Sequence, residues 1–238
     1  MADMTVDNAS GALLTLLAPQ RCYWCAALSP GPPACASCVA ALPWNVRACR
    51  ACALPLGSAC EGSVCAECLR DSPPQDRSWA AFRYDAPVAQ AIIELKFRGR
   101  LAPAHVIGRL MADRLANRPQ PLPELLIPVP LHTQRLRRRG YNQALELARE
   151  LARRLSLLLA PRAARRVHAT GEQTLLDAAA RRRNVRGAFA VDAAVVRGRH
   201  VALLDDVITT GATVAELARA TRAAGAARIE VWAVARVV

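Results

Sequence analysis

Two adjacent acidic residues, Asp205 and Asp206, follow a run of hydrophobic residues and precede the segment ITTGAT, residues 208–213. An apolar run of this length predicts a buried strand, and the residues after Gly211 have the pattern of a helix. In an open parallel sheet, the ligand crevice lies beyond the carboxyl ends of the strands, which is where the two carboxylates fall. Their position makes both residues candidates for a binding site.

The turn between this strand and the following helix has the composition of a phosphate-binding loop. The first N–H groups of a helix lack partners within the helix, and the helix dipole favours an anion beside them. Gly211 lets the backbone approach a ligand closely, and threonine hydroxyls can donate further hydrogen bonds to an oxyanion. We therefore predict a phosphate cradle formed by Thr209, Thr210, Gly211, Ala212 and Thr213.

Asp205 and Asp206 would repel a phosphate bound beside them, so we expect them to face vicinal hydroxyl groups or a Mg²⁺ ion. A ribose 5-phosphate offers both the hydroxyls and the phosphate that the two halves of the segment require. The alternative is that the two residues are only loop residues and a helix cap. We disfavour it because two adjacent carboxylates at a buried edge are costly to desolvate unless a ligand uses them.

Eight of the nine cysteines form four Cys-x-x-Cys pairs. Two residues between thiolates allow a tight turn to present both sulfurs to one ion, and two such turns complete a tetrahedral shell. Four cysteine ligands leave no position for water, which favours a structural role over a catalytic one. The sequence therefore predicts two structural Zn²⁺ sites formed by Cys22, Cys25, Cys35, Cys38, Cys49, Cys52, Cys65 and Cys68.

The spacing of the cysteine pairs leaves their grouping open. Sequential grouping, 22/25 with 35/38 and 49/52 with 65/68, would give a tandem zinc ribbon, whereas interleaved grouping would give a cross-brace. Cys60 is left over, either as a small buried side chain or as a competing ligand of the second site. A thioredoxin-like redox role is disfavoured because no pair begins a helix after a core strand.

The chain length permits one α/β domain and a small appendage, but hardly two full-sized domains. We expect a terminal tail or helix at 1–20, a double zinc ribbon at 21–70, a linker at 71–78 and the main domain at 79–238. From Trp79 onward, apolar runs alternate with helical patterns, which is typical of a mostly parallel sheet flanked by helices. The pattern predicts strands at 79–85, 125–130, 200–206 and 228–238, and helices at 88–97, 105–116, 142–155, capped by Asn142, and 213–224.

Positive charge is concentrated in the middle of the chain. The net charge is +13, and residues 131–187 contain fourteen arginines and four acidic residues, whereas residues 1–70 hold four basic and four acidic side chains. A field so localised favours a polyanionic partner, although part of it could be the solvated face of a helix. Lys96, the only lysine, ends the predicted helix 88–97, where it could either serve the site or interact with the helix dipole.

The N-terminus carries Asp3 and Asp7 where a secretory signal would have positive charge, and its apolar run at 13–18 is too short for such a signal or for a membrane span. Later segments also fall short of the length of a membrane span. We therefore expect a cytoplasmic protein without membrane insertion.

The segment that begins with hydrophobic residues and continues with two acidic residues and TTGAT resembles the phosphoribosyl diphosphate (PRPP) signature of the type I phosphoribosyltransferases. The chain also resembles the competence protein F (ComF/GntX-like) family. The resemblance is carried, in this order, by the cysteine pairs, YDAPVAQAIIELKFRG, IPVPLHTQRLRRRGYNQALELA, HATGEQTLLDAAARRRNVRGAF and VALLDDVITTGATV. The resemblance implies a type I phosphoribosyltransferase-like sheet with an N-terminal double zinc ribbon. In some members it also implies a role in DNA uptake.

The resemblance further implies that PRPP binds with its 5-phosphate in the TTGAT loop and its ribose hydroxyls at Asp205 and Asp206. The pyrophosphate would lie near Arg139 and Gly140, in a basic loop that also holds Arg135, Arg137, Arg138 and His132. Asp205, Asp206 and Arg139 are thus the candidate catalytic residues. Mg²⁺ would bridge pyrophosphate and ribose oxygens and offset the charge of the leaving group.

Two parts of the chain bear on the acceptor of the phosphoribosyl group. Gln173, Arg183 and Asn184 match the family pattern in a segment that could close over the site. Thr209 stands where purine-salvage relatives often have an acid that takes a proton from the base. No general base is visible in the sequence, which disfavours a purine and leaves an orotate-like or unusual acceptor open.

Two functions of different classes stay open. One is a PRPP-binding phosphoribosyltransferase, an enzyme of the glycosyltransferase class, that acts on an unknown nitrogen acceptor. The other is a non-catalytic single-stranded-DNA-binding module that senses PRPP or a nucleotide. The basic charge and the zinc ribbons favour the second function, whereas the scarcity of aromatic residues argues against it. The family resemblance implies partners in the uptake machinery, such as a competence helicase.

Overall fold

The computed structural model describes residues 21–31, 33–57, 63–167 and 186–238. The expected tail at 1–20, Cys60, and the family-matching residues Gln173, Arg183 and Asn184 lie outside them. Contacts divide the chain into two compact units, Met1–Leu42 and Pro43–Val238. The domain boundaries that we expect from the sequence stay a prediction, but this division places the second cysteine cluster in the larger unit.

The described residues of the smaller unit, 21–31 and 33–42, contain the first cysteine cluster and the short helix α2 (Ala36–Ala41). An isolated bridge pairs Arg21 with Leu28, and α2 follows directly after Cys35. Within these described residues the regular structure is short, so a metal ion bound by the four cysteines would be a main source of their stability.

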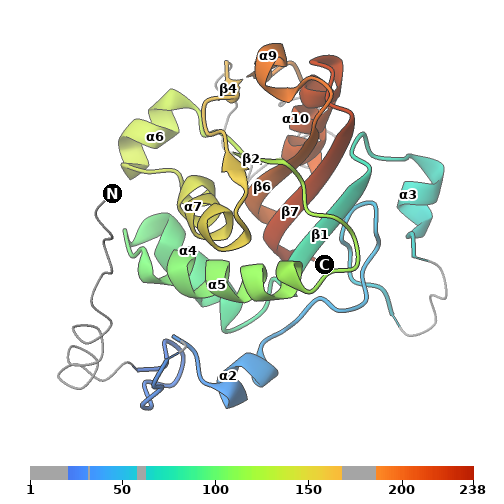
Figure 1. Cartoon of the computed structure of the whole chain (residues 1–238). Helices are drawn as coiled ribbons and strands as arrows, with labels where there is room; N and C mark the ends of the chain where they lie inside the picture. The colour runs from blue at the N-terminus through green and yellow to red at the C-terminus, as the bar shows by residue number, and fades with distance from the viewer. Residues whose placement is uncertain (1–20, 32, 58–62, 168–185) are drawn as a thin grey trace, which may run out of the picture. The chain divides into compact units, whose positions relative to one another are not determined.

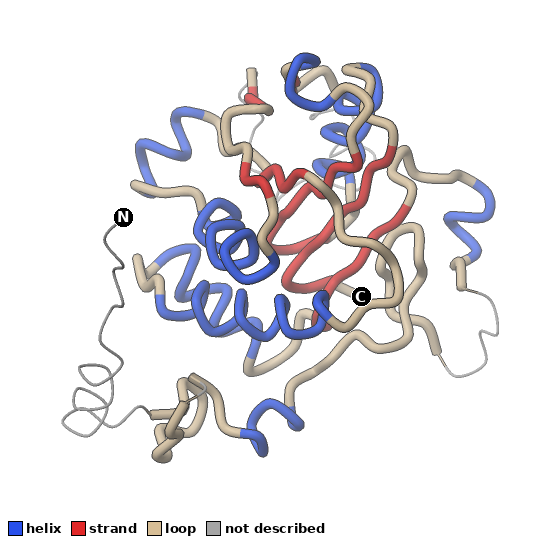
Figure 2. The backbone as a smooth tube through the Cα atoms, viewed as in Figure 1, coloured by secondary structure: helices blue, strands red, loops and turns tan. Residues whose placement is uncertain are grey.

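A five-stranded parallel sheet forms the centre of the larger unit (Figure 2). Its strand order is β1-β7-β6-β2-β3, and each neighbouring pair is parallel. The mostly parallel sheet expected from the sequence is therefore confirmed. The strands are β1 (Arg77–Arg83), β2 (Leu125–Pro128), β3 (Leu158–Leu159), β6 (His200–Ile208) and β7 (Arg228–Arg236).

Helices cover both faces of this sheet (Figure 1). On one face, α5 (Ala102–Ala116) packs against both α4 (Val88–Phe97) and α7 (Gln143–Leu155), and α7 contacts β2 and β6. On the other face, α10 (Ala212–Ala223) contacts β6 and β7. Smaller elements are α3 (Ala66–Arg70), α6 (Thr133–Arg139), α9 (Ala193–Val196) and the antiparallel pair β4 (Ala164–Arg166) and β5 (Phe189–Val191).

The predicted strands and helices of the main domain form close to their expected positions. The helix α7 is capped as expected, because the Asn142 side chain accepts a hydrogen bond from the Ala144 N–H at 3.0 Å. The helix α5 begins three residues earlier than expected, because Pro103 near its start fits the first helical turn. Among the described helices, none has the length and apolar composition that a membrane crossing requires.

A buried ionic cluster joins the amino-terminal ends of two central strands. Glu230 of β7 is 1% exposed and accepts two hydrogen bonds from the Arg118 guanidinium, each 2.7 Å long. The Trp232 indole N–H donates to the same carboxylate at 3.0 Å, and the His200 ring lies 3.2 Å from it. These partners satisfy a charge that would otherwise be expensive to bury, and they lie at the end of the sheet away from Asp205.

Candidate functional site

The two adjacent carboxylates lie near the carboxyl end of β6, and Gly211 (φ 77°) turns the chain from the strand into α10. Beside them is a cavity of about 640 Å³. This cavity brings together most of the residues that the sequence nominates for PRPP, namely Asp205, Asp206, Thr209, Thr210, Gly211, Ala212, Thr213 and Arg139. Gly140 does not line it and instead lines a neighbouring hollow with Leu136 and Tyr141.

The loop from Thr209 to Gly211 leads directly into the first turn of α10. Thr209 and Thr210 are exposed, and the Thr210 hydroxyl accepts a hydrogen bond from the Ala212 N–H at 3.4 Å. A helix of twelve residues directs its positive dipole end toward this loop. The geometry is suited to a dianionic phosphate, which would replace the weak internal hydrogen bond.

Asp206 is engaged by Lys96. The carboxylate is 4% exposed, and the Lys96 ammonium, from the last turn of α4, lies 3.1 Å from its Oδ2 atom. Of the two roles open for Lys96 in the sequence, the structure therefore favours the one at the site. A buried carboxylate paired in this way is held in place and is less available to a ligand than its neighbour Asp205.

Asp205 has a different environment from Asp206. Burial raises the pKa of Asp205 to about 7, and the charge of Asp206 adds to this rise, whereas Lys96 opposes it. Its Oδ1 atom accepts a hydrogen bond from the Asp206 backbone N–H at 2.9 Å. A hydroxyl donor or a cation bound at Asp205 would favour the ionised carboxylate.

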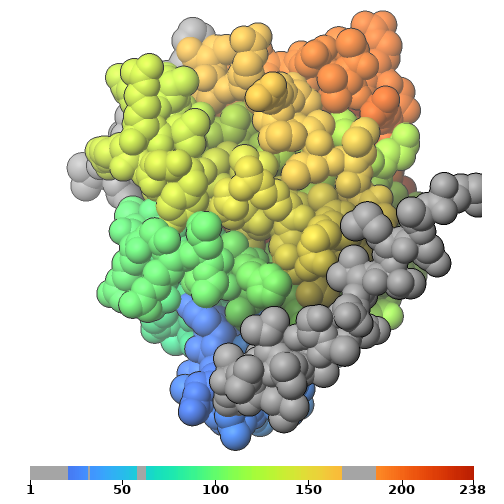
Figure 3. Space-filling model, turned by 60° about the vertical axis from the view of Figure 1, so that its left-hand side comes forward, coloured from blue at the N-terminus to red at the C-terminus, as the bar shows by residue number. Residues whose placement is uncertain are grey.

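The basic segment expected to be a loop forms the short helix α6 instead. His132 caps its start by accepting a hydrogen bond from the Gln134 N–H at 3.3 Å, and Gly140 (φ 82°) ends it. The intervening glutamine, leucine and arginines are good helix formers, which explains the difference. Figure 3 shows the surface of α6 and α7 next to that of α4 and α5.

Arg139 of α6 lines the cavity and lies over the ring of Phe97. It is half-buried, whereas Arg137 and Arg138 are exposed, and its guanidinium lies 5.3 Å from the centroid of the Phe97 ring. Burial lowers the pKa of Arg139, and the attraction of Asp206 opposes this change. Arg135 and Arg138 also line the cavity, so three guanidinium groups of α6 border one volume.

Sequence reasoning did not nominate several other residues that line the cavity, among them Arg166, Tyr141, Phe97 and Tyr84. Arg166 lies on the three-residue strand β4, and burial lowers its pKa. No pattern in the sequence marks so short a strand. The Tyr141 hydroxyl donates to the Leu95 carbonyl and ties the chain after α6 to α4, a contact between residues far apart in the sequence.

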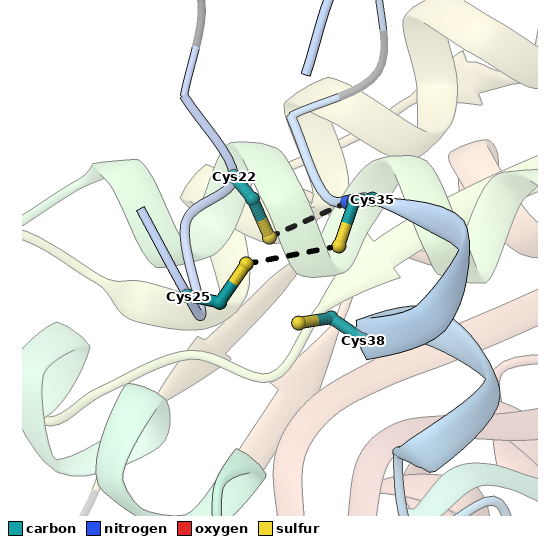
Figure 4. A group of neighbouring side chains, drawn as sticks. All are labelled: Cys22, Cys25, Cys35 and Cys38. Atoms are coloured by element: carbon teal, nitrogen blue, oxygen red, sulfur yellow. Dashed lines mark hydrogen bonds between the residues drawn. The ribbon is translucent and has the colours of Figure 1, made fainter. Parts of the chain in front are cut away.

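The cysteines group sequentially. Figure 4 shows the Sγ atoms of Cys22, Cys25, Cys35 and Cys38 turned toward one another. In each of two clusters, this one and Cys49, Cys52, Cys65 and Cys68, all four sulfurs lie within 4.8 Å of one another, and all eight cysteines are free of disulfides. The structure thus favours the tandem arrangement over the cross-brace.

The hydrogen bonds within each cluster are those of metal-binding cysteine turns. The Cys35 N–H donates to the Cys22 sulfur and the Cys65 N–H donates to the Cys49 sulfur, both at 3.3 Å. The two equivalent bonds show that both clusters use the same local geometry. Backbone N–H groups directed at sulfur stabilise thiolates, which are the form that binds a metal ion.

The acidities of the cysteines also fit a bound cation. The Ser37 hydroxyl lowers the pKa of Cys35 to about 6, and the neighbouring Cys35 raises the pKa of Cys38 to about 12. Burial raises the pKa of Cys52 to about 11. Four close thiols cannot all ionise without a positive charge among them, and a Zn²⁺ ion would supply that charge.

Comparisons with known proteins identify the family. Residues 138–237 match the family described as "Phosphoribosyl transferase domain". The chain is 36% identical over 206 residues to the DNA utilization protein YhgH of Salmonella typhi, covering 85% of this chain and 89% of that protein. It is 39% identical over 178 residues to Competence protein F of Haemophilus influenzae, covering 72% and 78% of the two chains. The chain belongs to the competence protein F family.

The family assignment confirms the resemblance drawn from the quoted motifs, and with the parallel sheet and the two cysteine clusters it confirms the predicted fold class. One solved structure, titled as the allosteric regulatory enzyme of purine biosynthesis, has a TM-score of 0.41 and 17% identity. The match covers 60% of this chain and 30% of that enzyme. The roles of individual residues in this member of the competence protein F family stay predictions.

Proposed function

We propose that this protein binds PRPP together with Mg²⁺ in the cavity beside Asp205 and transfers the phosphoribosyl group to a nitrogen acceptor. The observation that carries the proposal is the convergence of three groups on one cavity: the loop before α10, the carboxylate of Asp205 and the guanidinium groups of α6. They match the phosphate, the hydroxyls and the pyrophosphate of one molecule. The phosphoribosyltransferase domain of the family supports the same ligand.

In this proposal the chain acts by positioning and by charge. The N–H groups at the start of α10 and the Thr209, Thr210 and Thr213 hydroxyls bind the 5-phosphate. Asp205 accepts hydrogen bonds from the ribose hydroxyls and is the carboxylate available to orient the hydrated Mg²⁺. Bound Mg²⁺ would offset the negative charge of the departing pyrophosphate.

The α6 guanidinium groups complete the proposed reaction site. Arg139 and Arg135 donate hydrogen bonds to the pyrophosphate, which stabilises the charge that it gains as its oxygen separates from C1 of the ribose. The nitrogen of the acceptor forms the new bond to C1 on the opposite face and releases its proton to solvent. Lys96 holds Asp206 and keeps the carboxylate pair from repelling the ligand further.

The proposal is tested by calorimetric titration of the zinc-loaded protein with PRPP and Mg²⁺. We expect saturable binding that is lost in the Asp205→Asn/Asp206→Asn double variant and retained in Asp113→Asn, a matched change at an exposed residue of α5. A pyrophosphate-release assay over a panel of nitrogen acceptors then tests turnover. Absence of binding to the native protein would remove the site assignment, and binding without turnover would leave a PRPP sensor.

A second candidate function is the binding of single-stranded DNA, favoured by the exposed arginines of α6. Arg137 and Arg138 are exposed, and the Phe97 ring beside Arg139 is 70% exposed. Cationic groups beside an open aromatic face suit a backbone phosphate and a stacked base. The names of the relatives, DNA utilization protein YhgH and Competence protein F, agree with this function.

Fluorescence anisotropy of a labelled oligonucleotide tests DNA binding. We expect affinity that falls steeply with salt and that weakens in an Arg137→Gln variant, while PRPP binding changes less, because Arg137 is not among the residues that line the cavity. We further propose that the protein acts in the cytoplasm with proteins of the DNA-uptake machinery, a competence helicase among them. Salt-independent binding, or none, would leave the PRPP function alone.

A further inference from the structure

Arg236 joins the second cysteine cluster to the loop before α10. It is the last residue of β7, lies opposite Ile208 at the end of β6, and is 9% exposed. Its Nε atom donates to the Cys52 carbonyl at 3.2 Å, and its Nη1 atom donates to the carbonyls of Ile208, at 3.3 Å, and Thr209. One buried guanidinium thus bonds the backbone of a cysteine ligand and the backbone of the loop.

The turn that contains Cys52 is held to the sheet along its length. The Arg50 carbonyl accepts a hydrogen bond from the Ser78 N–H at 2.7 Å, and the Ala51 carbonyl accepts from the Ser78 hydroxyl at 2.7 Å. Two residues on, the Ala53 carbonyl accepts from the Asn45 side chain at 2.9 Å. Four successive carbonyls of this turn therefore have fixed partners, and a change in the turn must disturb several of them.

Around Arg236 the turn and the loop border a common cavity of about 530 Å³. Cys52 and Cys68 line it on the side of the cysteine cluster, and Thr210 and Gly211 line it on the side of the loop. Atoms that face each other across a cavity make no direct contact, so a structural change on one side is poorly transmitted to the other. The guanidinium of Arg236 spans the two sides by direct hydrogen bonds, which makes it the natural connection between them.

We propose that Arg236 is a positioning residue that couples metal occupancy of the second cysteine site to the phosphate-binding conformation of residues 209–213. With metal bound, the turn keeps the Cys52 carbonyl in place, and the shared guanidinium holds the Ile208 and Thr209 carbonyls. The N–H groups at the start of α10 then face the ligand. This inference rests on the proposed function, because it assumes that the loop binds the 5-phosphate of PRPP.

Such coupling is reciprocal. If metal at the second site raises the affinity for PRPP, bound PRPP must raise the affinity of that site for the metal by the same factor, and we expect the tighter binding to appear as slower release. A lysine at position 236 would keep the charge, but it lacks the planar fork of donors that reaches several carbonyls at once. The Arg236→Lys variant should therefore bind metal and yet lose the coupling.

The test uses the full-length, zinc-loaded protein and a colorimetric chelator that removes zinc, with and without PRPP and Mg²⁺. We expect PRPP to slow one phase of zinc release by about fivefold or more, within the usual range of coupling between sites. The slowed phase should persist in Cys25→Ser, which disables the first site only. In Arg236→Lys, PRPP should slow neither phase.

Two control variants accompany this measurement. Arg219→Lys is the matched change, because Arg219 lines the same cavity but pairs with Glu216 at 2.7 Å, and it should keep the slowing. The Asp205→Asn/Asp206→Asn variant should show no slowing, which excludes an effect of PRPP on free zinc. Equal slowing in Arg236→Lys and in the native protein would overturn the proposal.

Hydrogen exchange separates failure of the coupling from failure of the proposed function. If calorimetry finds no PRPP binding, the proposed function fails, but chelation of the second site in Cys25→Ser should still speed exchange of the 209–213 amides by about tenfold. Core amides of Leu126 and Leu203 should not change. Unchanged exchange at 209–213 overturns the coupling whether or not PRPP binds, and it decides the matter if Arg236→Lys does not fold.

Discussion

Lowering the pH from 8 to 6 should weaken PRPP binding through protonation of Asp205. Burial, aided by the charge of Asp206, raises the pKa of this carboxyl to about 7. The ribose hydroxyls and Mg²⁺ need the ionised carboxylate as an acceptor, so binding competes with the proton. Because the pKa lies above its ordinary value, the ionised form dominates above pH 7 and is lost below it.

The size of the effect follows from this pKa. With a pKa of about 7, the ionised fraction of Asp205 falls about tenfold between pH 8 and pH 6, and the affinity should fall by the same factor. At pH 7, binding should release about half a proton, because half of the carboxyl groups are protonated beforehand. Lys96→Gln should move the midpoint above pH 7, since Lys96 lowers the pKa of Asp205.

The assay is calorimetric titration with PRPP and Mg²⁺ at three pH values, repeated in buffers of different ionisation enthalpy to count protons. Asp205→Asn at each pH supplies the control, because the ligand's own phosphates titrate equally in both proteins. A ratio between the native protein and Asp205→Asn that is constant from pH 6 to 8 would refute the assignment of Asp205 as the ligand-facing carboxylate.

Three further predictions concern stability, each checked by thermal or denaturant unfolding of the zinc-loaded protein. Glu230→Gln should cost about 3 kcal/mol, because it leaves the Arg118 guanidinium buried without its counter-charge; a loss under 1 kcal/mol would show that the cluster relaxes around a neutral partner. Gly108→Ala should cost about 1–3 kcal/mol, since the new Cβ would lie 2.9 Å from the Glu150 side chain where α5 meets α7; an unchanged midpoint would mean that Glu150 moves aside freely. Asn142→Ala should cost about 1 kcal/mol through loss of the α7 cap, and Asn142→Ser should recover part of it; equal stability of the two variants would argue against the capping role.

Sequence periodicity predicted the elements of the main domain well because their patterns are local. The helix 88–97 and the strands at 125–130, 200–206 and 228–238 carry strong apolar runs, and each forms within a few residues of its expected ends. The short elements β3, β4 and β5 were not predicted, since two or three residues cannot show a period. The helix at 133–139 was also not predicted, because a segment so rich in arginine shows no apolar periodicity.

The candidate site was predictable where it depends on one contiguous segment. The carboxylates and the TTGAT loop follow one another, and the structure places them on one cavity. The ion pair of Lys96 with Asp206 joins residues of distant segments, and no spacing rule connects them. The role of Arg236 was equally hard to predict, because the carbonyls that it bonds come together only once β7 lies beside β6.

The structure also shows where the arginines of the basic region lie and which acidic residues they contact on α7. On α7, Arg149 pairs with Glu146, while Arg153 and Arg154 pair with Glu150. Three arginines of α7 thus share two carboxylates. The arginines of α6 border the candidate PRPP cavity or lie exposed beside it.

Because three arginines of α6 border the ligand cavity, we expect a polyanion to bind at α6 rather than along α7. If DNA and PRPP use neighbouring faces of one short helix, saturating PRPP should weaken oligonucleotide binding, because the pyrophosphate neutralises guanidinium groups that the DNA would contact. Replacing Arg149 and Arg153 by glutamine should leave both ligands nearly unaffected, whereas replacing Arg138 should weaken both. Independent binding of the two ligands would place the DNA elsewhere on the chain.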